Sequence, residues 1–278
     1  MHGASITIED EHDARIADYL DVRERDLAGP SSRPGLFVGE SAIVVDRMLA
    51  IGGITKSVFV EERHAEAMRS RMDATGHGGV PLFVAPDSVL RKVAGFNVHR
   101  GVLAIGLRPA RDRMTLDAAV PRRDGAVIVV AEDITNVDNV GALYRNAAAF
   151  GVDAVVLSPR CHDHLYRKSL RVSMGHALRV PTARSTDWPA DLERLRGEFG
   201  FTLIVATPDS DAPVLADCVP PARTALLVGS EFSGVDPGTL ARADRRVRIP
   251  MSPGGDSLNV ATAAAICLYH LTREKIAR

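Results

Sequence analysis

The chain has 278 residues, of which 46% are hydrophobic and 25% charged, and its formal net charge is −1 at pH 7. This length fits one large domain or two ordinary ones, and the composition is that of a packed globular protein. No stretch has the roughly 20 apolar residues that span a bilayer. The polar, acidic start MHGASITIEDEHDAR is unlike a secretory signal. We therefore expect a cytoplasmic protein without a membrane partner.

The cysteines and histidines do not form a metal-binding pattern. Cys161, Cys218 and Cys267 are odd in number and widely spaced, which is atypical of disulfide frameworks and of zinc sites. The stretch CHDHLYRK, at 161–168, groups four potential ligands, but adjacent side chains point apart on a helix. We expect reduced thiols and no metal.

Basic residues gather in three stretches of this nearly neutral chain. Local basic patches can bind the phosphates of nucleic acid, although a solvated surface is the simpler interpretation of any one cluster. The clusters are Arg100, Arg108, Arg111, Arg113, Arg122 and Arg123; Arg160, Arg167, Lys168 and Arg171; and Arg242, Arg245, Arg246 and Arg248.

The first part of the chain, residues 1–110, predicts a small α/β or α+β domain. Apolar runs typical of strands alternate with helical patterns; the strands are expected at 35–40, 57–62, 81–86 and 101–107, and the helices at 41–53 and 61–76. A polar stretch with two prolines follows, at 108–125, and predicts a linker at 111–123.

The second part, residues 124–278, predicts a parallel α/β sheet. Short continuous apolar runs are typical of strands that are buried on both faces, and they occur at 126–131, 154–158, 202–207, 224–229 and 246–251. Helical stretches separate them, as in a parallel sheet. For the helix after the first of these strands, Asp138 or Asn139 is the expected N-cap and Gly151 the expected stop.

The common nucleotide and hydrolase motifs are missing from the sequence. It has no G-x-G-x-x-G after a strand, no G-x-x-x-x-G-K-[ST] and no G-x-S-x-G. Three polar loops remain, EDITNVDNVGALYR, GSEFSGVDPG and PMSPGGDSLN, and each follows a predicted strand. Ligands of open α/β sheets bind at the carboxyl ends of the strands. The polar side chains available there are Asn139, Arg145, Ser230, Glu231, Ser257 and Asn259.

In order and in spacing, the three loops resemble the motifs of the SpoU (TrmH-type) branch of the SPOUT RNA methyltransferases. The first motif, N-x-G-x-x-x-R-x-A, matches Asn139, Gly141, Arg145 and Ala147. The second, G-x-E-x-x-G, matches Gly229, Glu231 and Gly234. The third matches Ile249, Pro250 and Met251, a glycine-rich loop, and then Ser257, Leu258, Asn259 and Val260. The chain departs from the family at Asn146, where threonine is common, at Val235, where leucine or methionine is usual, and at Ala261, where serine is common.

This resemblance implies a fold and an activity. The expected fold is a C-terminal parallel-sheet domain with a deep trefoil knot, preceded by a ribosomal-protein-like RNA-binding domain. The implied reaction transfers a methyl group from S-adenosylmethionine to a ribose 2′-hydroxyl, in large-subunit rRNA rather than tRNA. A homodimer is implied, with the helix after Asn259 partly buried between the subunits. A tRNA ribose methyltransferase, a base methyltransferase and a non-catalytic RNA-binding protein of the same fold are the alternatives.

Site roles follow by analogy with the family motifs. Arg145, Ser257, Asn259 and Glu231 are the expected catalytic residues, and Gly229, Ile249, Met251 and Leu258 the expected cofactor-binding residues. A guanidinium has a pKa above about 12, so we expect Arg145 to grip the substrate phosphate and to stabilise the developing alkoxide rather than to act as a base. The simpler alternative for the third motif is that Ser257 is only an N-cap and Asn259 an early helical residue.

Overall fold

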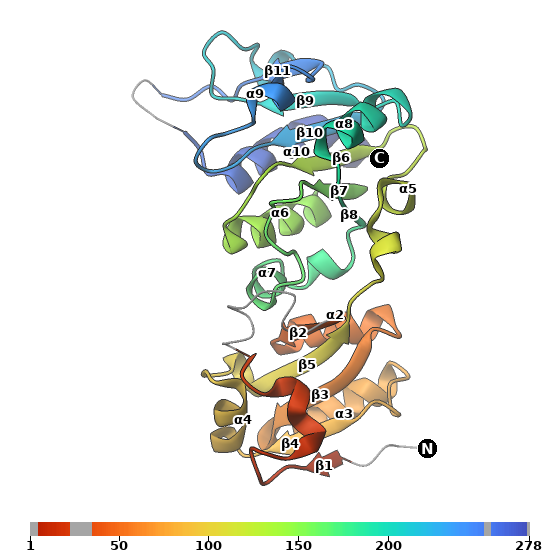
Figure 1. Ribbon diagram of the computed structural model, residues 1–278, viewed down its shortest axis with the longest axis vertical. Coiled ribbons are helices and arrows are strands. Elements are labelled where there is room, and N and C mark those ends of the chain that lie inside the picture. Colours follow the sequence, from red (N-terminus) through yellow and green to blue (C-terminus); the bar gives the residue numbers. More distant parts are fainter. Residues whose placement is uncertain (1–4, 23–34, 253–256, 277–278) are drawn as a thin grey trace. The chain divides into compact units, whose positions relative to one another are not determined.

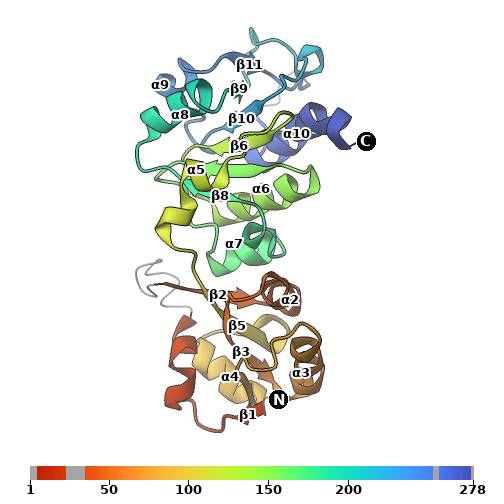
Figure 2. The same ribbon diagram turned by 90° about the vertical axis from the view of Figure 1, so that its right-hand side faces the viewer.

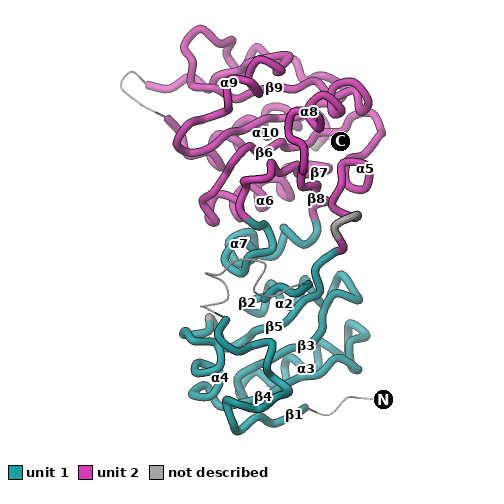
Figure 3. The backbone as a smooth tube through the Cα atoms, viewed as in Figure 1, with its two compact units in different colours: residues 1–109, 163–179 teal, residues 110–162, 180–278 magenta. Residues whose placement is uncertain are grey.

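The computed structural model describes residues 5–22, 35–252 and 257–276, which form two compact units (Figure 3). Unit 1 comprises Met1–Pro109 and Asp163–Arg179, and unit 2 comprises Ala110–His162 and Val180–Arg278. Unit 1 thus takes a segment from the middle of the chain, for which the sequence gives no signal. The division into a domain at 1–110, a linker at 111–123 and a domain at 124–278 stays a prediction.

Unit 1 is built on a mixed five-stranded sheet with the order β1-β4-β3-β5-β2 (Figure 1). β1, β4 and β3 are parallel, whereas β5 is antiparallel to both of its neighbours. The strands are β1 (Ser5–Thr7), β2 (Leu36–Glu40), β3 (Thr55–Glu61), β4 (Leu82–Ala85) and β5 (Val102–Leu107). The four predicted strands are confirmed, and β1 adds a short edge strand that was not expected.

Helices cover both faces of this sheet (Figure 2). The α-helices are α2 (Ala42–Ile51), α3 (Ala65–Ala74), α4 (Asp87–Ala94) and α7 (Arg167–Val172), and the 3-10 turns are η1 (Ala14–Tyr19), η3 (Glu62–His64), η4 (His99–Gly101) and η6 (His176–Leu178). On one face, Tyr19 and Leu90 pack with Phe59 and Phe83 of the sheet. On the other face α2 lies so close that a Cβ on Gly39 would come within 2.4 Å of Met48 Sδ.

Ion pairs hold the segment Asp163–Arg179 within unit 1. Arg108 donates to both carboxylate oxygens of Asp163, with distances of 3.2 and 2.6 Å. Burial alone would raise the pKa of Asp163, but the hydrogen bonds and charge of Arg108 outweigh burial and lower that pKa below its ordinary value. The buried carboxylate of Glu40 likewise accepts hydrogen bonds from Arg167 and Arg171.

Unit 2 contains a six-stranded sheet with the order β11-β9-β10-β6-β7-β8, in which every neighbouring pair is parallel. Its strands are β6 (Val127–Ala131), β7 (Ala154–Leu157), β8 (Thr182–Arg184), β9 (Thr202–Ala206), β10 (Thr224–Val228) and β11 (Arg245–Val247). The predicted parallel sheet is confirmed. The three-residue strand β8 was missed, and β11 ends before the predicted 251.

Helices lie on both faces of this second sheet as well (Figure 1). They are η5 (Arg111–Met114), α5 (Leu116–Ala119), α6 (Val137–Ala149), α8 (Trp188–Gly197), η7 (Leu215–Asp217), α9 (Pro237–Leu240) and α10 (Val260–Ile276). Leu116, Leu192 and Leu195 of α5 and α8 belong to one core cluster with Ile128 and Leu227 of the sheet. On the opposite face α6 and α10 pack against each other.

Candidate functional site at the carboxyl edge of the second sheet

The strand order of unit 2 brings two predicted loops together. From β6 the chain continues to β7 and β8 on one side, whereas β10 pairs with β6 on its other side. Glu132, which follows β6, donates its backbone N–H to the carbonyl of Val228 at the end of β10, at 2.9 Å. Such a point, where consecutive strands leave in opposite directions, is where open α/β sheets bind ligands.

The N-cap of helix α6 lies two or three residues before the predicted cap residues. Asn136 is the N-cap, and its side chain accepts from the backbone N–H groups of Asp138 at 2.8 Å and Asn139 at 3.4 Å. The prediction of Asp138 or Asn139 as N-cap is therefore wrong, because Asn136 satisfies these donors first. Gly151, with φ +62°, follows the helix as predicted. The side chain of Asn139 is consequently available for contacts outside α6.

The loop after β10 is a closed hairpin. Ser230 and Gly234 exchange two backbone hydrogen bonds of 3.0 Å each. A Cβ on Gly229 would lie 2.3 Å from the Gly234 carbonyl carbon, and Gly234 has φ +68°. Both positions therefore require glycine, the first for close backbone approach and the second for a left-handed conformation. This hairpin fixes the position of Glu231.

Three side chains, one from each predicted motif, form a hydrogen-bonded chain. The Asn259 side-chain amide donates to Asn139 Oδ1 at 2.8 Å. The Asn139 amide in turn donates to Glu231 Oε1 at 2.7 Å. The second carboxylate oxygen of Glu231, Oε2, is buried and has no partner in the described chain. We call these residues the Asn259–Asn139–Glu231 relay.

Asn259 also caps the last helix. Its Oδ1 accepts from the backbone N–H groups of Ala261 at 2.9 Å and Thr262 at 3.2 Å. The simpler alternative for the third motif is therefore only partly right, since capping belongs to Asn259 rather than Ser257. The amide group of Asn259 remains free to join the relay, so a single side chain serves both purposes.

The two departures from the family motifs that lie on α6 and α10 contact each other. The side chain of Asn146 on α6 donates to the carbonyl oxygen of Ala261 on α10, at 2.8 Å. Beside it, Arg145 is exposed, and its guanidinium has no hydrogen-bond or ion-pair partner in the described chain. Ser257 is exposed as well. Of the predicted catalytic residues, the structure joins Asn259 and Glu231 through Asn139 and forms no bond from either to Arg145 or Ser257.

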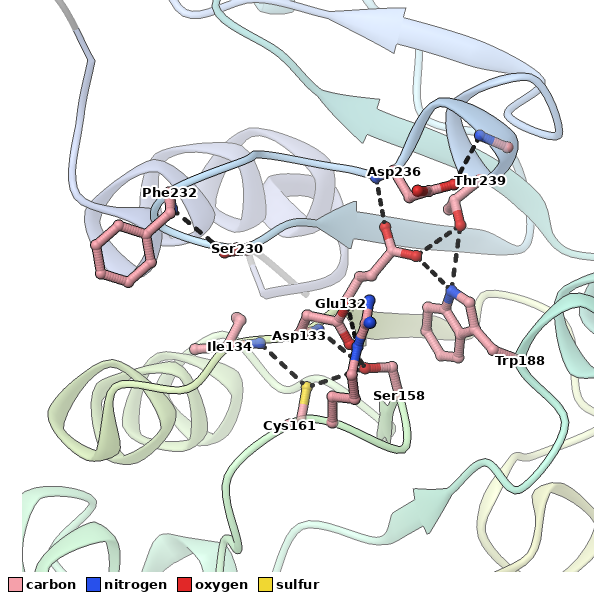
Figure 4. Close-up of polar contacts among 12 residues, drawn as sticks. Glu132, Asp133, Ile134, Ser158, Cys161, Trp188, Ser230, Phe232, Asp236 and Thr239 are labelled. Atoms are coloured by element: carbon pink, nitrogen blue, oxygen red, sulfur yellow. Dashed lines mark hydrogen bonds and ion pairs between the residues drawn. The ribbon is translucent and has the colours of Figure 1, made fainter.

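A second network at this edge was missed from the sequence. Glu132 is 3% exposed, and its carboxylate accepts from Trp188 Nε1 at 2.6 Å, Thr239 Oγ1 at 2.6 Å and the Asp236 backbone N–H at 2.9 Å (Figure 4). These bonds fix the start of α9, directly after the hairpin. An acidic residue at the end of an apolar strand was the available signal.

Asp133, the next residue, is held in a left-handed conformation, with φ +54°. Its backbone N–H donates to Ser158 Oγ at 2.9 Å, and that hydroxyl donates back to the Asp133 carboxylate at 2.7 Å. Arg160 forms an ion pair with the same carboxylate, and its hydrogen bonds lower the pKa of Asp133 despite partial burial.

Most arginines of the three sequence clusters have internal partners of this kind. The ion pairs are Arg108–Asp163, Arg122–Asp117, Arg123–Asp153, Arg160–Asp133, Arg167–Glu40, Arg171–Glu40, Arg242–Glu193 and Arg246–Asp209. The simpler interpretation of these clusters is therefore favoured for most of their members.

The described part of the chain contains no group of three histidine, cysteine or acidic side chains that could hold a metal ion. Across the same residues, none of the helices has the length and apolar character needed to cross a membrane.

A protein-family model matches the part of the chain that carries this site. A model described as the SpoU rRNA Methylase family matches residues 126–269, which include all three motifs and the relay. The chain belongs to the SpoU rRNA methylase family. The predicted family membership is thereby confirmed.

Relatives of this SpoU-family chain are similar over most of its length. A Mycobacterium tuberculosis protein named as an uncharacterized tRNA/rRNA methyltransferase is 40% identical over 269 residues, which cover 95% of this chain and 90% of the relative. The 23S rRNA (guanosine-2′-O-)-methyltransferase RlmB of Acinetobacter baylyi is 29% identical over 199 residues, 71% of this chain and 80% of the relative.

A solved structure shares the fold of this SpoU-family chain. An AdoMet-bound rRNA methyltransferase from Sinorhizobium meliloti superposes with a TM-score of 0.79 and 20% identity, over 96% of this chain and 97% of that chain. The similarity includes both units and supports the α/β architecture described above.

The predicted cofactor-binding residues of this SpoU-family chain lie on three segments of unit 2. Gly229 directly follows β10, Ile249 and Met251 follow β11, and Leu258 precedes α10. Met251 is 36% and Leu258 37% exposed, so both offer apolar surface. No hydrogen bond joins any two of these four residues in the described chain.

Proposed function

We propose that the protein transfers a methyl group from S-adenosylmethionine to a ribose 2′-hydroxyl of RNA, in large-subunit rRNA. The observation that carries this proposal is the Asn259–Asn139–Glu231 relay, which ties the three SpoU motifs together where the strand order reverses. The RlmB relative is named for guanosine 2′-O-methylation of 23S rRNA, which supports the ribose and the large subunit.

The residues present fit S-adenosylmethionine. The buried Glu231 Oε2 lacks a donor, and a buried carboxylate oxygen without one is costly. A hydroxyl or amino group of the bound molecule would satisfy it. The exposed apolar side chains of Met251 and Leu258 suit the flat adenine ring. S-adenosylmethionine supplies, when bound, a methyl group on a sulfonium that is already a good leaving group.

Arg145 is proposed to act on the RNA. Its exposed guanidinium has no internal partner in the described chain, so it can bind a phosphate without first breaking an ion pair. The same cation stabilises the negative charge that develops on the attacking 2′-oxygen. Ser257, exposed just before α10, is proposed to bind the same phosphate. Water or the phosphate takes the proton, because a guanidinium stays protonated.

Unit 1 is proposed to bind RNA. Arg47 on α2 has a buried Nη1 without a partner in the described chain. Burial, and then the positive charge of Arg179, lower the pKa of Arg47. Two neighbouring cations without an acidic partner favour an anion between them, and RNA phosphate is such an anion.

We further propose a homodimer, a trefoil knot in unit 2 and a cytoplasmic location. The dimer is supported by α10, which exposes Ile266 and Tyr269, by 39% and 66%, on one helical face. The knot is supported by the return of the chain from the edge strand β11 to Asn259, which bonds to Asn139 on α6, the helix that follows the central strand β6.

The proposal is tested by methyl transfer. Protein, radiolabelled S-adenosylmethionine and RNA from cells that lack this gene are incubated, and the RNA is separated into rRNA and tRNA before alkaline hydrolysis. We expect label in the large-subunit rRNA, in a dinucleotide that resists alkali because its 2′-oxygen is methylated. Label in tRNA would favour the alternative substrate. Label in an alkali-sensitive product would indicate base methylation, and no label with no cofactor binding would contradict the proposal.

A further inference from the structure

Phe232 is the most exposed large apolar side chain in the described part of the chain. It is 91% exposed, compared with 76% for Val219 and 66% for Tyr269. Single exposed apolar residues are common on protein surfaces. The position of this one is unusual, since it directly follows Glu231 of the relay and lies at the turn of the hairpin.

The hairpin holds Phe232 in place. Besides the two backbone bonds between Ser230 and Gly234, the Phe232 backbone N–H donates to Ser230 Oγ at 3.2 Å. Glu231 is anchored to Asn139 at 2.7 Å. The backbone on both sides of the ring is therefore fixed by bonds that do not involve the ring itself.

The ring points away from the internal contacts of this edge. Figure 4 shows Phe232 directed away from the group formed by Glu132, Trp188 and Thr239. Its neighbour Glu231 makes the inward contact to the relay instead. A phenyl ring that packs against nothing contributes no burial to folding, so the fold does not require an aromatic residue here.

We propose that Phe232 stacks on an unpaired base of the RNA, at the target nucleotide or next to it. This inference rests on the proposed function and adds that the target region of the RNA substrate is unpaired. A base can stack on an aromatic side chain only when it has left its own helix, so the nucleotide lies in a loop, a bulge or another single-stranded segment.

The position favours RNA over the other possible partners of the ring. The cofactor is assigned to Gly229, Ile249, Met251 and Leu258, and the contact between subunits to the exposed face of α10. Arg145, the proposed phosphate contact, lies on α6, which Asn139 ties to the hairpin. An exposed ring and a guanidinium without a partner in the described chain, carried by two elements that a hydrogen bond joins, are the groups that bind single-stranded nucleic acid.

The test compares Phe232→Ala, Phe232→Tyr and Val219→Ala with the wild type. Val219 is the matched control, as an exposed apolar residue of the same unit. Retention on filters measures binding to RNA from cells that lack the gene, and to the same RNA after annealing to complementary DNA. Binding of S-adenosylmethionine is measured calorimetrically, and the KM for RNA and kcat come from methyl transfer.

We expect Phe232→Ala to weaken RNA binding and raise the KM for RNA by about 5- to 150-fold, the range of base–aromatic stacking. Phe232→Tyr keeps the ring and stays within about 3-fold of wild type. Val219→Ala and the affinity for S-adenosylmethionine stay unchanged. Annealed RNA binds wild type and Phe232→Ala equally weakly, because its bases are paired.

Equal binding of single-stranded RNA by wild type and Phe232→Ala would overturn the inference. So would a loss of the dimer in Phe232→Ala, seen by sedimentation, which would assign the ring to a second copy of the chain. Weaker S-adenosylmethionine binding would assign it to the cofactor. Filter binding needs no catalysis, so the inference is judged even if the wild type transfers no methyl group and the proposed function fails.

Discussion

The side-chain amide of Asn259 donates a 2.8 Å hydrogen bond to the side-chain oxygen of Asn139, across 120 residues of sequence. The side-chain amide of Asn139 also donates a hydrogen bond to Glu231, so Asn139 is the central residue of the relay. A side chain that is 8% exposed and bonded at both ends contributes to stability as well as to the site.

Replacing Asn139 by alanine should destabilise unit 2. Both bonds are lost and the carboxylate of Glu231 is left partly buried without any donor, at a cost of about 2 kcal/mol. For a chain of this size we expect the melting temperature to fall by about 4–8 °C. Differential scanning calorimetry measures the change.

Two further variants separate the contribution of the relay to stability from that of the N-cap of α6. Asn136→Ser keeps a capping oxygen on α6 and should melt close to wild type. Adding Glu231→Gln to Asn139→Ala removes the unpaired charge and should recover part of the loss. A double variant no more stable than Asn139→Ala alone would show that the relay does not hold Glu231 as described.

Arg145→Ala should fold and bind S-adenosylmethionine like the wild type but lose activity. Removing a group that stabilises developing negative charge costs about 10²- to 10³-fold in kcat. Arg145→Lys should recover only a small part, because lysine cannot form the two parallel bonds of a guanidinium. Single-turnover methyl transfer and calorimetric cofactor binding measure both effects.

Arg113 provides the matched control for charge removal, since it is exposed and lies in the same unit. Arg113→Ala should keep wild-type turnover. If Arg145→Ala also kept it, the proposed role of Arg145 would be wrong.

The sequence was sufficient for the parts of the fold that depend on local pattern. The buried strands β6, β7, β9 and β10 are continuous apolar runs. The ends of these runs located each strand within about two residues. The three-residue strand β8 is too short to produce such a pattern. The start of α6 was misplaced because Asn136, Asp138 and Asn139 are all good caps, and only the folded backbone selects among them.

The site was predictable as three neighbouring loops but not as a set of bonds. Parallel strands end at one edge, which brings the motifs together, whereas the pairing of Asn139 with both Glu231 and Asn259 depends on the strand order. The hydrogen bond from Asn146 to Ala261 could not be predicted either, because the two residues are 115 positions apart and only the fold brings them together. Buried Glu132 carried no motif, and only its bonds to Trp188 and Thr239 reveal its role.

The exposed face of α10 predicts how the subunits associate. Ile266 and Tyr269 are 39% and 66% exposed and lie three residues apart, so they share one face of the helix. A glutamate at either position would bury a charge in the proposed interface, which is costly without a partner. We expect Ile266→Glu and Tyr269→Glu to shift the wild-type dimer to a monomer in sedimentation equilibrium.

Val219→Glu adds the same charge at another exposed apolar position of unit 2 and should remain dimeric. Dimers of unchanged affinity in both α10 variants would place the contact between subunits elsewhere.

The ion pair between Arg108 and Asp163 predicts a pH-dependent stability of unit 1. The folded pKa of Asp163 lies below its ordinary value because of the bonds from Arg108, so the unfolded chain binds more protons in acid. The stabilisation is therefore complete above the unfolded pKa, about 3.9, and is lost as the pH falls through the folded pKa.

Asp163→Asn removes this contribution and leaves Arg108 without its counter-ion. At pH 7 we expect unfolding of the variant to require about 3 kcal/mol less than that of the wild type, as for other buried ion pairs that lose one partner. Below about pH 4 the difference should begin to shrink, because the carboxyl of the unfolded wild type becomes protonated there, and it should continue to shrink until the folded carboxyl is protonated as well. Urea denaturation at pH 7, 4 and 2 measures it.

Asp117→Asn is the control, because Asp117 also pairs with arginines but is 56% exposed. Exposed pairs contribute little, so this variant should follow the wild type at every pH. A wild type and an Asp163→Asn variant separated by the same free energy at pH 7 and pH 2 would mean that the charge of Asp163 does not hold the segment Asp163–Arg179 in unit 1. Convergence in acid, together with an unchanged Asp117→Asn, would assign that role to the single buried carboxylate.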